Sequence, residues 1–279
     1  MSRAVEINDL KISIPQRRED EKELLRGVNL QLQSGESLAL VGESGSGKSI
    51  TARSILGMFP RGAKVSGSVK VDGTEIVGAS SRELRRVRRS GVAMIFQDPR
   101  AHINPVRTVG HFLTETLIVS SGWSRKDAEE CAAQLLRDVG IPNAKERLNQ
   151  YPHQLSGGLL QRVMIAGALA DEPAILLADE PTTALDVTTQ EEVMAILMEM
   201  RQEKGLAMLF ITHDLELAAA TCDHTAVMYK GRVLEVNTSK ELHDSPEHPY
   251  TVQLLAARPS VAERRHRLPV VDMSEEQLP

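Results

Sequence analysis

The chain has 279 residues, of which 41% are hydrophobic and 25% are charged, and this composition is typical of a globular protein rather than a disordered one. Its net charge is −5 and only 3% of its residues are aromatic. Both values weigh against nucleic-acid binding, which favours a basic face and aromatic stacking platforms. No apolar run is long enough to span a membrane, and the N-terminus lacks the apolar core of a secretory signal, so we expect a cytosolic protein.

The first hundred or so residues read mainly as strands. Alternating or continuous apolar residues predict strands over 5–14, 28–32, 37–41, 68–71 and 92–96. The charged, apolar-free stretch 15–23 reads as a loop between the first two strands. A glycine-rich turn after the third strand leads into a predicted helix over 48–56.

Between about residues 97 and 154 helical periodicity replaces the strand pattern, and the apolar positions of 128–139 share one face. Alternation then resumes, with strands expected over 174–178, 207–211, 224–229 and 232–236 and helices over 188–204, 215–220, 240–243 and 251–257. We therefore predict an α/β core with an inserted helical subdomain at about 98–165. The charged end, 259–279, reads as a loosely held tail.

A nucleotide-binding motif lies between the third strand and the helix that follows it. It consists of Gly42, Glu43, Ser44, Gly45, Ser46, Gly47, Lys48 and Ser49, which match G-x-x-x-x-G-K-[ST]. Such a loop cradles phosphates with backbone N–H groups at a helix N-terminus, while Lys48 would reach the β- and γ-phosphates and Ser49 would ligate Mg²⁺. A glycine-rich connection with an accidental Lys is the alternative, and the strand–loop–helix context disfavours it.

The apolar strand 174–178 ends in two carboxylates, Asp179 and Glu180. In phosphate-loop proteins such a strand delivers an Asp to the magnesium ion, and the next carboxylate can hold or deprotonate the attacking water. The alternative is an acidic strand end that caps the turn at Pro181. The phosphate loop elsewhere in the chain favours the catalytic interpretation.

The run Leu155–Arg162 (LSGGLLQR) makes the chain resemble the nucleotide-binding subunits of ABC transporters, whose LSGGQ-type signature precedes such an acidic strand. Gln97 matches the Q-loop of that family, Ala184–Asp186 its D-loop and His213 its switch histidine, all in the family's order. The resemblance covers about residues 4–258. It implies a P-loop NTPase core of ABC ATPase architecture, with a mixed sheet that has antiparallel edge strands, in one domain over 1–258.

The resemblance also implies roles for individual residues. Glu180 would act as base or water-positioner, His213 would hold the γ-phosphate, and Gln97 would join Ser49 and Asp179 around Mg²⁺. Ser156, Gly157 and Gly158 would form a second anion cradle that faces the ATP of a partner subunit; a plain helix N-cap is the alternative for Ser156. Ile14 falls where the family places an aromatic that stacks on adenine.

Three segments resemble the oligopeptide, dipeptide and nickel importer branch of the family. They are Tyr151–Gly158 (YPHQLSGG), Gln97–Pro99 (QDP) with Asn104 and Pro105, and Ser245–Thr251 (SPEHPYT). The resemblance implies ATP and Mg²⁺ as cofactors and a peripheral position on the cytoplasmic face of the inner membrane. The implied partners are a second ABC ATPase subunit (a homologous chain or a copy), two transmembrane permease subunits and an extracytoplasmic substrate-binding protein, without nucleic acid. The cargo stays open.

The rival interpretation is a soluble ABC ATPase that acts on ribosomes or nucleic acid. Such proteins usually carry two ATPase halves or a long coiled-coil insert, and this sequence shows neither. Arginines cluster at 82, 85, 86, 88 and 89, and their helical spread favours a solvated face over a nucleic-acid or lipid-headgroup site.

Overall fold

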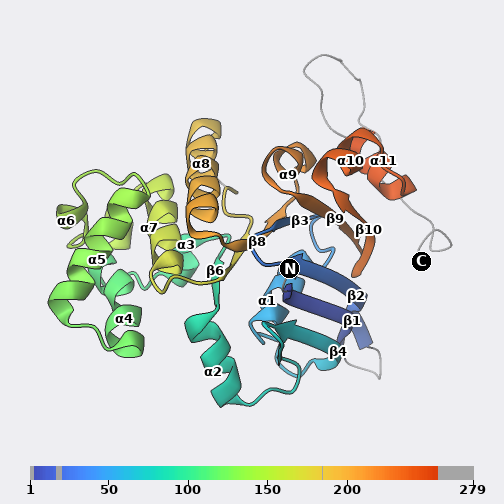
Figure 1. Ribbon diagram of the computed structural model, residues 1–279, viewed down its shortest axis with the longest axis horizontal. Coiled ribbons are helices and arrows are strands. Elements are labelled where there is room, and N and C mark those ends of the chain that lie inside the picture. Colours follow the sequence, from blue (N-terminus) through green and yellow to red (C-terminus); the bar gives the residue numbers. More distant parts are fainter. Residues whose placement is uncertain (1–2, 17–20, 184, 257–279) are drawn as a thin grey trace. The chain divides into compact units, whose positions relative to one another are not determined.

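A computed structural model describes residues 3–16, 21–183 and 185–256, which fall into two compact units (Figure 1). The first unit is formed by residues 1–79 together with 209–279, and the second by residues 80–208. Strand β8 (Ala207–Thr212), buried along its whole length, carries the chain from the second unit into the first. The predicted tail, 259–279, lies outside the described residues.

The first unit contains an antiparallel sheet with the strand order β2-β1-β4-β5. Its strands are β1 (Arg3–Pro15), β2 (Glu21–Gln33), β4 (Lys64–Val71) and β5 (Thr74–Glu75). Val5 and Ile7 alternate with more exposed neighbours and are at most 1% exposed, as period-two patterning requires. One face of the sheet is thus apolar.

The prediction of a loop over 15–23 is wrong at both of its ends. Pro15 still belongs to β1 and pairs with Glu21, the first residue of β2. The hydroxyl of Ser13 also donates to the Glu21 carboxylate at 2.9 Å. Charged side chains are compatible with strand structure here because they are exposed, so charge alone did not mark a loop.

A second group of strands in the first unit provides the frame for the nucleotide-binding motif. The buried strand β3 (Ser37–Val41) pairs in parallel with β9 (His224–Tyr229), and β9 pairs antiparallel with β10 (Arg232–Thr238). This pairing is the mixed sheet with an antiparallel edge that the sequence implied. The helices of this unit are α1 (Lys48–Ile55), α9 (Leu215–Thr221), α10 (Ser239–Asp244) and α11 (Pro249–Ala256).

The second unit combines two parallel strands, β6 (Val92–Ile95) and β7 (Ile175–Asp179), with helices. These helices are α2 (Ser81–Ser90), α3 (Pro99–His102), α4 (Val109–Ser121), α5 (Arg125–Asp138), α6 (Ala144–Arg147), a 3₁₀ turn over Pro152–Gln154, α7 (Gly157–Leu169) and α8 (Val187–Lys204). The expected helical character of 97–154 is confirmed. Helices α4, α5 and α7 pack together (Figure 1) through fully buried side chains such as Leu136 and Val163.

Helix α2 has a start signal in the sequence that the periodicity analysis did not use. Ser80 and Glu83 form a capping box, in which the Glu83 N–H donates to the Ser80 hydroxyl at 3.3 Å and the Ser80 N–H donates to the Glu83 carboxylate at 2.8 Å. Within the described part of the chain, none of the helices is both long and apolar enough to cross a membrane.

The start of β3 is held by a reciprocal pair of side chains. Asp223 accepts hydrogen bonds from the Ser37 N–H at 2.8 Å and the Ser37 hydroxyl at 2.9 Å, and its own N–H donates to that hydroxyl at 2.9 Å. Because Ser37 is fully buried, Asp223→Ala would leave two buried donors without this acceptor. We expect a loss of about 1–3 kcal/mol in the free energy of unfolding, measured by urea denaturation. The matched control Glu129→Ala, which removes an exposed carboxylate paired with exposed Arg125 on α5, should change stability by less than about 0.5 kcal/mol.

Candidate nucleotide site

The phosphate loop joins buried β3 to the N-terminus of α1, and its lysine is folded over the loop. Lys48 is 5% exposed, and its Nζ donates to the carbonyl oxygens of Gly42 at 2.7 Å and Glu43 at 2.8 Å. A buried ammonium costs free energy unless it is hydrogen-bonded, and these two carbonyls meet that requirement. The lysine charge is therefore held at the mouth of the loop, beside the positive end of the α1 dipole.

Two glycines of the loop lie in tight surroundings, Gly42 against backbone and Gly47 against side chains. Gly42 has a φ of +156°, and a Cβ at this position would lie 2.0 Å from the carbonyl oxygen of Met228. Gly47 has a φ of +109°, and its Cβ would lie 2.7 Å from the side chain of Leu25. The loop consequently packs directly against the backbone at the end of β9, where no side chain fits, and against the Leu25 side chain of β2.

The turn after β9 braces the loop from another side. The Gly231 N–H donates to the Ser46 carbonyl at 2.8 Å, and the Arg26 N–H donates to the Gly231 carbonyl at 2.8 Å. The hydroxyl of Ser46 is buried and has no hydrogen-bond partner among the described residues. A buried hydroxyl donor, a buried ammonium and a helix N-terminus together form a donor set that fits the oxygens of a polyphosphate.

The acidic strand end lies in the second unit. β7 is buried along its whole length, and it ends at Asp179, which is 1% exposed. The next residue, Glu180, accepts hydrogen bonds from the Gln97 side-chain amide at 3.0 Å and the Thr183 hydroxyl at 2.8 Å. The structure thus brings together Gln97 and Glu180, to which the sequence analysis assigned the roles of metal ligand and of base or water-positioner.

Thr183 was not singled out from the sequence. A hydroxyl three residues after the carboxylate, in the turn that follows Pro181, is the signal that could have identified it. Glu180 itself has a φ of +46°, in the left-handed region that side chains rarely occupy. Such backbone strain costs about 1–3 kcal/mol and gathers at functional positions. The two donors hold the Glu180 carboxylate in one orientation, and the strained backbone lies at the same residue.

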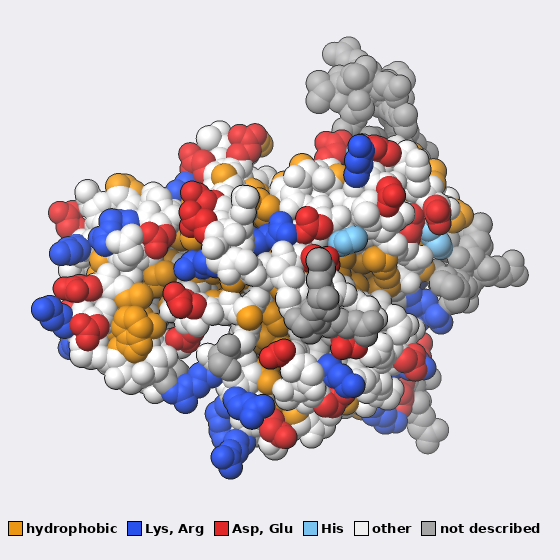
Figure 2. Space-filling view, viewed as in Figure 1, with side chains coloured by type: hydrophobic (Ala, Val, Ile, Leu, Met, Phe, Trp, Pro, Cys, Tyr) orange, Lys and Arg blue, Asp and Glu red, His pale blue; other side chains and the backbone are white. Residues whose placement is uncertain are grey.

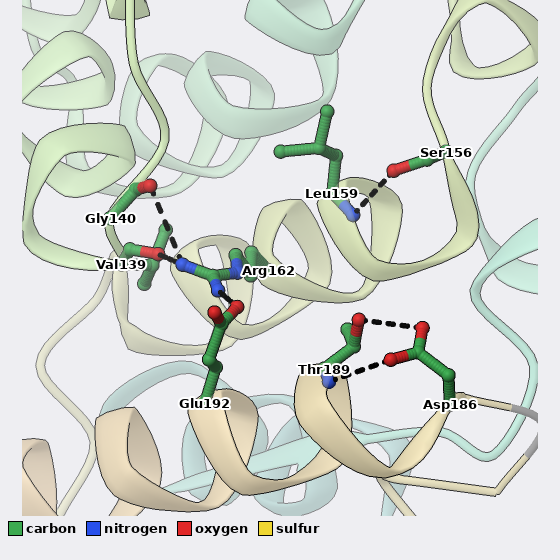
Figure 3. A network of polar contacts seen from close by, with 8 residues as sticks. All are labelled: Val139, Gly140, Ser156, Leu159, Arg162, Asp186, Thr189 and Glu192. Atoms are coloured by element: carbon green, nitrogen blue, oxygen red, sulfur yellow. Dashed lines mark hydrogen bonds and ion pairs between the residues drawn. The ribbon is translucent and has the colours of Figure 1, made fainter.

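The signature motif starts α7, and Figure 3 shows its surroundings in the second unit. Ser156 caps the helix, with the Leu159 N–H donating to its hydroxyl at 3.3 Å. A Cβ at Gly158 would lie 2.5 Å from the Thr189 methyl group of α8, so these two helices approach closely at the motif. The N-cap alternative for Ser156 is therefore real, and it is compatible with a cradle formed by the free N–H groups of the same helix turn.

Asp186, from the D-loop, caps α8 in the same way. Its carboxylate accepts from the Thr189 N–H at 3.0 Å and the Thr189 hydroxyl at 2.8 Å. These bonds, the backbone one first, lower the pKa of Asp186 below its usual range and keep the cap ionised at neutral pH. Ala184 of the D-loop lies outside the described residues.

Arg162, at the end of the signature run, joins three helices (Figure 3). Its guanidinium forms an ion pair with Glu192 of α8 and donates to the carbonyls of Val139 at 3.1 Å and Gly140 at 3.4 Å, just beyond α5. Arg162 is only 14% exposed, so the fork of donors is largely shielded from water. Helix α7 is thereby fixed to both of its neighbours.

The remaining predicted site residues divide between the two units. His213 is exposed and follows β8 in the first unit, which also holds the phosphate loop and Ser49. Ile14, predicted to lie near adenine, is half-buried in β1 of that unit and pairs with Lys22. Gln97, Asp179, Glu180 and the signature belong to the second unit. Their assembly with the phosphate loop into one catalytic site stays a prediction.

The arginines of α2 line an open groove in the second unit. Arg82, Arg85 and Arg89 are exposed, and Figure 2 shows basic side chains gathered over α2. The groove has a volume of about 1010 Å³ and also includes Val119 of α4 and Asp171, whose pKa burial raises.

Comparison with known proteins places this geometry in a family. The ABC transporter family model matches residues 25–183, more than half of the chain. The chain belongs to the ABC transporter family. It is an ATP-hydrolysing cassette that binds ATP with Mg²⁺, as the fit of the phosphate loop indicates.

The similar proteins cover most of the chain. The oligopeptide transport ATP-binding protein OppD of Bacillus subtilis is 43% identical over 94% of this chain and 73% of its own length. The dipeptide transport ATP-binding protein DppD of Haemophilus influenzae is 43% identical over 86% and 73%. Among solved structures, the dimeric post-hydrolysis state of the ATP-binding cassette MJ0796 bound to ADP and phosphate gives a TM-score of 0.76, with 29% identity over 84% of this chain and 98% of that one.

The close approach at Gly42 can be tested by adding one methyl group. Gly42→Ala should weaken ATP binding at least about tenfold, because the Cβ must push the loop away from the Met228 carbonyl and a displacement of ~1 Å costs that much or more. Gly45→Ala is the matched control: its φ is +80°, but a Cβ there meets nothing within 4 Å. Both variants carry backbone strain of about 1–3 kcal/mol, so equal losses of ATP affinity by calorimetry would contradict the steric argument.

Proposed function

We propose that this chain is the ATP-binding subunit that powers an importer of oligopeptides or dipeptides. The observation that carries the proposal is the 42–45% identity to named peptide-transport ATP-binding proteins over 83–94% of the chain. The segments Tyr151–Gly158 and Ser245–Thr251 support the same branch. Its partners would be a second ATPase subunit, two permease chains and an extracytoplasmic binding protein, and it would work at the cytoplasmic face of the inner membrane.

The phosphate loop is proposed to grip the nucleotide. The N–H groups of residues 42–49 and the Ser46 hydroxyl would bind phosphate oxygens, and Lys48 would exchange its loop carbonyls for the β- and γ-phosphates. Ile14 would cover one face of the adenine. Bound Mg²⁺ supplies charge neutralisation at the phosphates, and Ser49, Gln97 and Asp179 are the residues proposed to hold it.

Hydrolysis is proposed to depend on Glu180. Its carboxylate, held by Gln97 and Thr183, would accept a proton from the attacking water or orient that water. His213 would position the γ-phosphate. Gln97 precedes α3 and the helical segment of its unit, so a change at Gln97 on hydrolysis could be passed to a membrane subunit.

A partner chain is proposed to complete the site. The N-terminus of α7, with Ser156, Gly157 and Gly158, would bind the γ-phosphate held by the phosphate loop of the second ATPase subunit. Two chains would then close on ATP and separate when hydrolysis removes the charge that joins them. The dimeric arrangement described for the similar cassette MJ0796 supports pairing.

The transport proposal can be separated from action on ribosomes or nucleic acid by fractionation. Co-expressed with its permease chains, the protein should sediment with membranes, and its ATPase rate in proteoliposomes should rise when peptide-loaded binding protein is added. Without the permeases it should stay in the supernatant. Co-sedimentation with ribosomes, together with ribosome-stimulated hydrolysis, would contradict the transport proposal.

Glu180→Gln tests the proposed base. Gln keeps the size of the side chain and can still accept from Gln97 and Thr183, so folding and ATP affinity should be retained. The hydrolysis rate should fall by about 10²–10⁴-fold, measured as phosphate release at saturating ATP. The control Glu203→Gln, on an exposed position of α8, should hydrolyse ATP at the wild-type rate. A Glu180→Gln chain with wild-type turnover would show that the base lies elsewhere.

Ser156→Arg tests the cradle at the start of α7. The bulky cation should abolish partner-dependent hydrolysis while the isolated chain still binds ATP. Ser124→Arg is a matched control, because Ser124 caps α5 with the same type of bond and its loss costs a similar ~1 kcal/mol of stability. ATPase rate against protein concentration is the measurement. If both variants behave alike, Ser156 is only a helix cap.

A further inference from the structure

The segment Ser245–Thr251 marked a branch of the family in the sequence but has no role in the proposed mechanism. In the first unit it is fixed by Glu235 of β10, whose carboxylate accepts from the N–H groups of Glu247 at 2.9 Å and His248 at 3.1 Å. The Nδ1 of His248 in turn accepts from the Tyr250 N–H at 3.1 Å. One carboxylate and one imidazole thus set the path of the backbone as it enters α11.

This path brings Tyr250 to the back of the nucleotide site. Tyr250 is fully buried, and its ring lies 4.4 Å from the ring of Tyr229, tilted by 40°. Its hydroxyl is buried and has no hydrogen-bond partner among the described residues. Burial and the Glu43 carboxylate raise the pKa of Tyr250, so the phenol is neutral.

The partner ring belongs to the part of β9 that shapes the loop. Tyr229 follows Met228, whose carbonyl oxygen leaves no room for a Cβ on Gly42. Two residues after Tyr229, the Gly231 N–H holds the Ser46 carbonyl at 2.8 Å. The ring of Tyr250 is therefore packed against the strand end that contacts the phosphate loop.

We propose that Tyr250 is a positioning residue of the ATP site and that the Ser245–Thr251 segment holds it in place. Aromatic pairs hold a defined geometry, and packed interiors transmit displacements rather than absorb them. Loss of the ring lets the Met228–Gly231 turn relax, and the phosphate loop moves with it. This inference rests on ATP binding by this chain. It gives Tyr250, which lies outside the phosphate-loop motif, a role in shaping the loop.

The test compares Tyr250→Leu with Tyr250→Phe in the full-length chain. Tyr250→Leu should weaken ATP and ADP binding about tenfold and raise KM for ATP in proportion, with kcat at saturating ATP little changed. Tyr250→Phe keeps the ring and should bind both nucleotides within about twofold of wild type. Tyr250→Met gives the same readout as Tyr250→Leu if the Leu variant does not fold.

Two controls separate positioning from ordinary packing. Leu242→Ala, at a position of α10 that is 1% exposed, should lower the melting temperature at wild-type ATP affinity, and Val252→Ala, at a position of α11 that is 47% exposed, should change neither. A Tyr250→Leu chain that melts lower but binds ATP as wild type overturns the proposal. So does a Tyr250→Phe chain that binds as weakly as Tyr250→Leu. A wild-type chain that binds no ATP would instead defeat the proposed function.

Discussion

The contact of the phosphate loop with the end of β9 is the constraint on which the nucleotide site depends. Gly42 lies so close to the Met228 carbonyl that a Cβ would not fit, and the Gly231 N–H donates a hydrogen bond to the Ser46 carbonyl. With the loop braced in this way, the ammonium of Lys48 can be buried and bonded to two loop carbonyls. Backbone rather than side chains forms the brace, so its geometry follows from the pairing of β3, β9 and β10.

The second unit is organised around helix starts instead. Ser156 and Asp186 cap α7 and α8, and the contact between Gly158 and Thr189 sets these two starts side by side (Figure 3). Arg162 adds bonds to α8 and to the end of α5. A displacement of one helix start would therefore carry the other with it, so the proposed anion cradle at α7 is coupled to the D-loop at α8.

The sequence predicted those parts of the site that are contiguous motifs. Residues 42–49 and Asp179–Glu180 could be placed at strand ends because an apolar strand pattern stops directly before each motif. Family order gave Gln97 and Glu180 their proposed roles, but their mutual hydrogen bond needed the folded chain, because the two residues are 83 positions apart in the sequence. The same holds for the packing of Tyr250 against Tyr229. The ends of the predicted loop 15–23 were misjudged because exposed strand residues can be charged without cost to the core.

The left-handed backbone of Glu180 has a consequence for how this protein can change. A residue without a Cβ, or a short Asn, would relieve the strain at φ +46°, so a chain selected for thermal stability alone would drift away from glutamate at this position. Glutamate as the proposed base at this position would therefore trade stability for activity. Substitutions of Glu180 that raise the melting temperature of this ATPase should therefore also lower its turnover.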